Sequence, residues 1–190
     1  MSKISNAGVE QSETPGKTQP GIANLPLRYH ISWGTYGSWL PGDPRGFRTR
    51  SHRQHIDGDY RNPPPTGKYA ALHAYARDAL KKPPVTIEAD LQQIVALACL
   101  EQFAKEAADV SAISVDCWHV HVAVVCPAAG IKQMIGRVKK VSSHRVRRRI
   151  PGRLWQAGCH IVPIRNEEHW RNVLAYIAAH GRKGWAWRKA

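Results

Sequence analysis

The stretch Cys117-Trp-His-Val-His-Val-Ala-Val-Val-Cys126 decides the fold of this chain. Its β-branched valines, with no Gly or Pro among them, predict a β-strand. In a strand, alternate side chains fall on opposite faces. One face is fully apolar and consists of Trp118, Val120, Val122 and Val124. It should pack on a core, while the other face presents His119, His121, Ala123 and Val125.

Two histidines two residues apart on one strand face can share a ligand. Their Cα atoms lie roughly 6.5–7 Å apart, so both rings of His119 and His121 can reach one divalent metal ion. A third ligand must then come from elsewhere in the chain. The alternative is that both imidazoles line a polar sheet face, which is the commoner situation for a bare His-x-His. The rest of the chain has to decide between the two.

The composition indicates one globular domain with an anionic partner. The 190 residues include 28 Lys and Arg against 14 Asp and Glu, which gives a formal charge of +14. Such an excess favours nucleic acid as the partner. A ribosomal or membrane-surface role would carry a similar charge, so composition alone does not choose among them.

The cysteines and the apolar segments point to a location inside the cell. Four cysteines lie far apart with no Cys-x-x-Cys, which argues against a zinc ribbon or a redox pair. Free thiols are typical of a reducing cytoplasm. There is no signal peptide pattern and no apolar run of membrane-spanning length, so we expect a cytoplasmic protein with no membrane partner.

The first part of the chain alternates between irregular and regular segments. Residues 1–24 are rich in Ser, Gly, Gln and Pro and are predicted to be a disordered tail. The single domain then spans 25–190. Its first strand is predicted over 27–33, where Leu, Tyr, Ile and Trp alternate with polar residues. Residues 41–84 form a Pro-rich and His-rich insertion, in which only 69–80 is helical in pattern.

The remaining segments predict an α+β fold. Thr86 is expected to N-cap a helix that runs to about residue 108, followed by a strand over 110–115 and a turn at Asp116 into the His-x-His strand. A helix over 130–149, a strand over 159–164 and a helix from Asn166 to His180 complete the chain. This order matches a ferredoxin-like split βαβ antiparallel sheet, with helices on one face and an added terminal helix.

The helix predicted over 130–149 is densely basic outside its apolar stripe. No acidic residue occurs between Asp116 and Glu167. Intrahelical ion pairs are therefore absent, and we expect phosphate contacts instead. The candidate DNA-binding residues are Lys132, Arg137, Lys139, Lys140 and Arg145. Trp155, Trp185 and Trp187 are candidates for stacking on exposed bases, with core packing as the alternative for each.

The terminal helix carries two stripes. Trp170, Val173, Leu174 and Ile177 are spaced for burial. Beside them, Tyr176 and His180 are i and i+4 and therefore neighbours one turn apart. A tyrosine at this margin is an ordinary boundary residue in most helices. Together with His119 and His121, however, the pair could supply a nucleophilic phenol beside a three-histidine metal site.

This set of motifs resembles the HUH single-tyrosine transposases of bacterial insertion sequences and the REP-associated tyrosine transposases. The matching pieces are His119-Val-His121, the basic helix after it, Leu154-Trp-Gln156, and Tyr176-Ile177. The resemblance covers about residues 27–36 and 86–181. It lies in the order and spacing of the whole set, since a His-x-His alone is weak evidence.

The resemblance implies an enzyme that cuts and rejoins hairpin-bearing single-stranded DNA. With Mg²⁺ or Mn²⁺ on the histidines, Tyr176 would form a 5′-phosphotyrosine link and release a 3′-OH. The family often has Gln or Asn where this chain has His180, and imidazole favours Mn²⁺ over Mg²⁺. A homodimer is compatible with the resemblance. The sequence leaves open whether Tyr176 acts in its own subunit or in a partner's.

Other classes of function remain as alternatives. One is a domesticated or non-catalytic single-stranded nucleic-acid-binding protein, in which the histidines are structural. Another is a relaxase or replication-initiator type of HUH nuclease, for which 190 residues leave no room for a helicase or primase domain. A zinc hydrolase would want a carboxylate base near the metal, and the histidine face of the strand offers none.

Overall fold

The computed structural model describes residues 26–45, 47 and 64–189. The tail predicted over 1–24 and most of the first half of the 41–84 insertion lie outside these residues. Within the described ranges, none of the helices combines the length and apolarity needed to cross a membrane.

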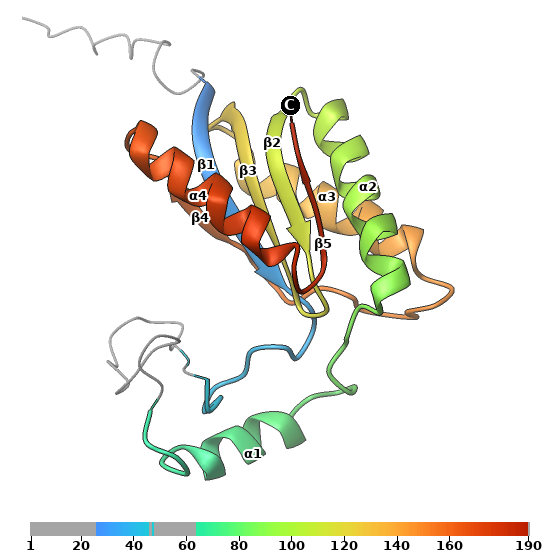
Figure 1. The fold of residues 1–190 in the computed structure, drawn as a ribbon. Coiled ribbons are helices and arrows are strands. Elements are labelled where there is room, and N and C mark those ends of the chain that lie inside the picture. The colour runs from blue at the N-terminus through green and yellow to red at the C-terminus, as the bar shows by residue number, and fades with distance from the viewer. Residues whose placement is uncertain (1–25, 46, 48–63, 190) are drawn as a thin grey trace, which may run out of the picture.

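A single five-stranded antiparallel sheet organises the molecule (Figure 1). Its strands are β1 (Pro26–Gly34), β2 (Asp109–Val115), β3 (His119–Pro127), β4 (His160–Pro163) and β5 (Trp185–Arg188). The helices are α1 (Ala70–Asp78), α2 (Ala89–Lys105), α3 (Ile131–Arg145) and α4 (Glu167–His180). The strand order is β4-β1-β3-β2-β5, so the predicted His-x-His strand β3 lies at the centre. The predicted α+β class is confirmed.

The fifth strand is a correction to the predicted topology. Residues 185–188 pair with β2, from Val115 opposite Trp185 to Ala112 opposite Arg188. Trp185 and Trp187, predicted as candidates for base stacking, therefore belong to an edge strand. A segment of only four residues, Trp-Ala-Trp-Arg, is too short to establish the alternation by which a strand is predicted.

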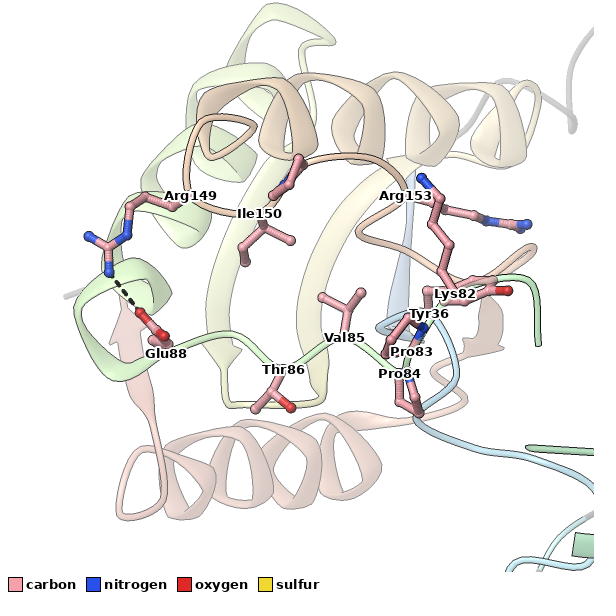
Figure 2. A pocket seen from close by; sticks show the side chains of 11 residues that line it. Tyr36, Lys82, Pro83, Pro84, Val85, Thr86, Glu88, Arg149, Ile150 and Arg153 are labelled. Atoms are coloured by element: carbon pink, nitrogen blue, oxygen red, sulfur yellow. Dashed lines mark hydrogen bonds and ion pairs between the residues drawn. The ribbon is translucent and has the colours of Figure 1, made fainter. Parts of the chain in front are cut away.

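The chain between β1 and α2 is tied to one end of the sheet. The backbone N–H of Val85 donates to the carbonyl of Tyr36, and that of Ile87 donates to the carbonyl of Cys117, each at 2.8 Å. Figure 2 shows this extended segment passing the end of the sheet before α2 begins. The predicted cap at Thr86 is wrong because residues 85–87 are held extended by these bonds, and Glu88 takes the N-cap position.

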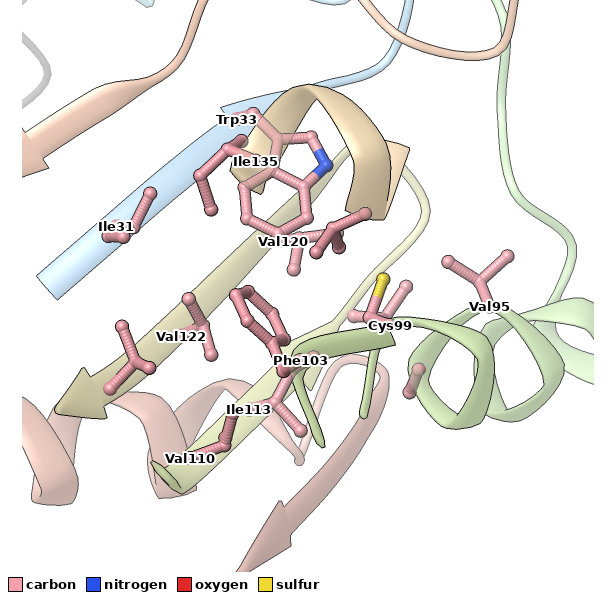
Figure 3. Packing of buried hydrophobic residues seen from close by; sticks show 14 of the residues in the cluster. Ile31, Trp33, Val95, Cys99, Phe103, Val110, Ile113, Val120, Val122 and Ile135 are labelled. Carbon is pink, nitrogen blue, oxygen red and sulfur yellow. The ribbon is translucent and has the colours of Figure 1, made fainter. Parts of the chain in front are cut away.

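The apolar face of β3 packs as predicted. Val120, Val122 and Val124 are fully buried in a core that β1, β2, α2 and α3 share with them. Figure 3 shows Phe103 of α2 and Ile135 of α3 over this face of the sheet. Trp118 is the exception, because it precedes the strand and is 39% exposed.

The histidine face of β3 is covered as well. α4 packs on it through its predicted apolar stripe, Trp170, Val173, Leu174 and Ile177, against Ala112 and Ala123. The predicted N-cap of this helix is confirmed, since the Asn166 side chain accepts a hydrogen bond from the backbone N–H of His169. Helices therefore lie on both faces of the sheet, α2 and α3 on one and α4 on the other.

Candidate active site

Three histidines meet where β3 begins and α4 ends. His119 and His121 point from β3 toward α4, and His180 is the last residue of that helix. One nitrogen from each ring lies within 4.8 Å of the others. The ring centres of His119 and His121 are 4.6 Å apart, and that of His180 is 5.1 Å and 4.7 Å from them. The His-x-His motif of β3 and the last turn of α4, expected from the sequence to contribute to one site, therefore lie side by side.

The orientation of His119 is set by Asp116, in the turn between β2 and β3. Its Oδ1 accepts hydrogen bonds from the backbone N–H groups of Trp118 and His119, each at 2.7 Å. The Nδ1 of His119 lies 2.8 Å from the same oxygen. Burial raises the pKa of Asp116, but the hydrogen bonds from His119 and Trp118 outweigh it and hold that pKa below its usual range. An ionised Asp116 therefore fixes Nδ1 as the protonated nitrogen of His119 and leaves Nε2 for a ligand.

The orientation of His121 is set by His30 of β1. The Nε2 of His30 lies 3.0 Å from the Nδ1 of His121. If His121 donates from Nδ1 and His30 accepts, the Nε2 of His121 is free to bind a metal ion. His30 pairs with Ala123 in the sheet register, which puts its side chain diagonally beside His121.

The buried nitrogens at this site fit a metal ion. The Nε2 of His121 and the Nδ1 of His180 are buried, and neither has a hydrogen-bond partner among the described residues. Burial, then the neighbouring His119, lowers the pKa of both rings, that of His121 to about 2. Neutral imidazole is the form that binds metals. Two buried nitrogens without hydrogen-bond partners, beside a third imidazole, are what a divalent cation would satisfy.

Tyr176 lies against this histidine cluster. Its ring centre is 5.1 Å from that of His121 and 4.6 Å from that of His180. The residue is 46% exposed, so it is accessible from solvent. The tyrosine therefore faces the histidines of its own subunit.

One family model covers the part of the chain that holds these residues. Residues 80–180, just over half of the chain, match the model of the family described as "Transposase IS200 like". The chain belongs to the IS200-like transposase family. The matched residues include His119, His121, Tyr176 and His180.

The chain also resembles solved structures. Among solved structures, the chain is similar to one described as a REP-associated tyrosine transposase bound to a REP hairpin. The two are 14% identical, with a TM-score of 0.47, over 90% of this chain and 76% of that one. The search of curated proteins gave no significant match.

The basic residues of α3 lie on the other face of the sheet from the histidines. The expectation that they lack acidic partners is wrong for two of them. Arg137 pairs with Glu106, and Arg145 pairs with Glu101 of α2, with N···O distances of 2.6 Å. Lys139 donates to the carbonyls of Gln156 and Gly158. These partners lie 17 to 44 positions away in sequence, so a pattern read along one helix misses them.

Lys132 and Lys140 differ from the other three candidate DNA-binding residues on α3. Both are exposed, and neither has an ion-pair partner within the ranges that the structure describes. They remain candidates for phosphate contacts. DNA binding by the five residues on α3 is still a prediction.

Trp155 is not a base-stacking residue. It is buried in the core, where its indole Nε1 donates to the hydroxyl of Ser142 at 3.1 Å. The Leu154-Trp-Gln156 segment instead connects the core to β1, since Thr35 and Trp155 form a β-bridge.

Two hollows flank the insertion at the end of the sheet near His119. One has a volume of about 310 Å³ between the 82–88 segment and residues 149–153, and it has Lys82 and Arg153 on its rim (Figure 2). The other, of about 300 Å³, is lined in part by Arg45, Arg77 and Trp118. Both lie beside cationic side chains.

Asp116 and His30 are the site residues that the sequence patterns missed. Asp116 reads as an ordinary turn residue, and His30 as one polar position of an alternating strand. Asp116 lies in the turn before β3 and not on its histidine face, so this carboxylate reaches His119 from outside the strand. Oδ1 of Asp116 accepts from two backbone N–H groups and lies 2.8 Å from the Nδ1 of His119, while its Oδ2 lies 3.9 Å from the Nδ1 of His180. This carboxylate therefore faces two of the three histidines.

Proposed function

We propose that this protein cuts and rejoins single-stranded DNA with Tyr176 as the nucleophile. The observation that carries the proposal is the convergence of Tyr176 with His119, His121 and His180 from two elements of one chain. Membership of the IS200-like transposase family supports the same chemistry.

His119, His121 and His180 would hold a divalent ion, Mn²⁺ or Mg²⁺. When bound, such an ion offsets the negative charge that develops on the scissile phosphate. Three imidazoles favour Mn²⁺, because Mg²⁺ prefers oxygen ligands and gives up water reluctantly. Asp116 and His30 keep two of the imidazoles in the tautomer that a metal ion requires.

Tyr176 would carry the covalent step. Its phenolic oxygen forms a bond to phosphorus and loses its proton, while the bond from phosphorus to the 3′-oxygen breaks and that oxygen takes up a proton. The products are a 5′-phosphotyrosine and a free 3′-OH. The reverse reaction joins strands without a nucleotide cofactor, since the phosphodiester is exchanged for another ester of similar energy.

The substrate we propose is single-stranded DNA with a hairpin, as the family resemblance implies. Exposed Lys132 and Lys140 on α3 would contact phosphates away from the cleavage site. Arg137 and Arg145 could also contact phosphates only if each guanidinium were shared between its carboxylate partner and a phosphate. A homodimer stays an expectation, and the geometry within one chain supports cleavage in the same subunit that holds the metal.

The test is a covalent trapping assay with labelled single-stranded hairpin DNA and Mn²⁺. We expect the wild-type protein to form an adduct on denaturing gels and Tyr176→Phe to form none, with DNA binding retained. Tyr75→Phe is the matched control, because Tyr75 is 73% exposed on α1 and far along the chain from the site. DNA binding by the wild-type protein without any metal-dependent adduct would favour the non-catalytic alternative.

A further inference from the structure

Two exposed tryptophans meet on one arginine close to the histidine cluster. The guanidinium carbon of Arg45 lies 4.5 Å from the ring centre of Trp39 and 4.3 Å from that of Trp118. Trp39 and Trp118 are 45% and 39% exposed. We call these three residues the Trp-Arg-Trp cluster. Trp118 directly precedes the candidate metal ligand His119, so the cluster lies at the same end of the sheet as the candidate active site.

The arginine of this cluster is held in place independently of the two rings. Its Nε and Nη2 donate to the two carboxylate oxygens of Asp43 at 2.9 Å and 2.6 Å. Nη2 also donates to the carbonyl of Ser38 at 2.7 Å. The side chain of Asp43 is only 5% exposed. A buried carboxylate that hydrogen-bonds to one edge of a guanidinium fixes the plane of the guanidinium and leaves the faces of the guanidinium to the aromatic rings.

Trp118 is also fixed. The backbone N–H of Trp118 donates to the Asp116 side chain, and the Trp118 carbonyl accepts from the backbone N–H of Thr35 at 2.7 Å. The turn that orients the candidate ligand His119 therefore also holds the backbone from which this ring projects. Packing of the 38–45 loop alone would favour burying both indoles, because an indole buries a large apolar area. Here each ring keeps more than a third of its surface open to solvent.

We propose that the Trp-Arg-Trp cluster is a stacking platform for unpaired bases next to the cleavage position. Stacking on aromatic side chains beside cationic groups is how proteins bind single strands without reading sequence. The hollow of about 300 Å³ beside Arg45 and Trp118 adds room for a base, and Arg77 lines it. This inference rests on the proposed function for its ligand, single-stranded DNA, and adds a binding site outside the histidines and Tyr176.

The test compares two strands that carry the same phosphates, with and without bases. Affinity is measured for dT20 and for an abasic strand of equal length, without metal and in the Tyr176→Phe background, so that no cleavage occurs. We expect Trp39→Ala to weaken dT20 binding by about tenfold and to leave the affinity for the abasic strand unchanged. Trp39→Phe should recover most of the lost affinity, because a ring remains to stack on.

Tyr75→Ala is the control, since Tyr75 is an exposed aromatic residue outside the cluster. It should change neither affinity. Equal weakening of both strands by Trp39→Ala, unchanged dT20 binding, or no measurable dT20 binding by the parent protein would each overturn the platform. The covalent trapping assay on wild-type protein is read separately. If the wild-type protein forms no adduct in that assay, the proposed cleavage is rejected, while base-dependent binding through Trp39 would still stand.

Discussion

The side chains that orient the candidate metal-binding histidines come from outside the His-x-His motif. Asp116 lies in the turn before His119, and His30 reaches His121 from the neighbouring strand. Each leaves one ring nitrogen free to face a metal ion. The precision of the candidate site therefore depends on a turn and on a strand register as well as on three histidines.

The role of Asp116 can be measured through metal affinity. Asp116→Asn keeps an acceptor for the backbone N–H groups of Trp118 and His119 but loses the charge beside the His119 ring. We expect Mn²⁺ affinity to fall by about 10- to 100-fold, as for other residues that orient a ligand. Calorimetric titration with Mn²⁺ gives the affinity. Asp109→Asn is the control, since Asp109 is in an exposed ion pair with Lys189. Equal affinities for the two variants would mean that Asp116 only shapes the turn.

Among the elements, α3 departs most from its sequence-based interpretation. The sequence predicts that five of its basic residues contact phosphates, but three of the five form ion pairs or hydrogen bonds with other parts of the protein. Lys139 fastens the loop before β4 through two carbonyls. Its neighbour Lys140 is exposed and carries no such contact among the described residues.

Adjacent lysines on α3 should therefore behave differently when replaced. Lys139→Gln should lower the free energy of unfolding by about 1–3 kcal/mol, because two carbonyls lose a charged donor. Lys140→Gln should leave stability within about 0.5 kcal/mol, as for an exposed residue without partners. Urea denaturation measures both. If the helix also contacts DNA phosphates, Lys140→Gln will flatten the plot of log K against log salt by about 0.7. Similar losses of stability in the two variants would contradict the structural role of Lys139.

The parts that the sequence predicts well are those with a clear local pattern. The alternation in β3 and the i, i+3, i+4 stripe of α4 predict which faces are buried, and Tyr176 and His180 follow from helical spacing. Partners distant in sequence were not predictable in this way. The Glu106–Arg137 and His30–His121 contacts depend on how helices and strands pair across the fold. The Trp39 and Arg45 contacts depend on an irregular loop.

Taken as one molecule, the protein places a partly buried histidine cluster inside a strongly basic chain. Burial lowers the pKa of His121 to about 2 and that of His30 to about 4, each helped by neighbouring histidines. In the unfolded chain both would take up a proton near pH 6.5. Between about pH 4 and 6.5 the unfolded state therefore binds more protons than the folded state, so stability falls as the pH falls.

The size of this effect can be isolated in the metal-free protein. Well below pH 6.5, each histidine that stays neutral in the fold lowers the free energy of unfolding by about 1.4 kcal/mol for every unit by which the pH falls. We expect the free energy of unfolding, measured with a chelator present, to fall less between pH 6 and pH 5 in His121→Gln than in the wild-type protein. Parallel pH profiles for the two proteins would mean that His121 is protonated in the fold.

The most direct test of the proposed cleavage is to locate the DNA on the protein. Trypsin releases the segment Asn172–Arg182, in which Tyr176 is the only tyrosine. After reaction with single-stranded hairpin DNA and Mn²⁺, followed by nuclease trimming, mass spectrometry should find a nucleotide 5′-phosphate on this peptide, attached to Tyr176. A nucleotide on a different tyrosine, or a cleaved strand with no nucleotide on any peptide, would contradict the assignment of Tyr176 as the nucleophile.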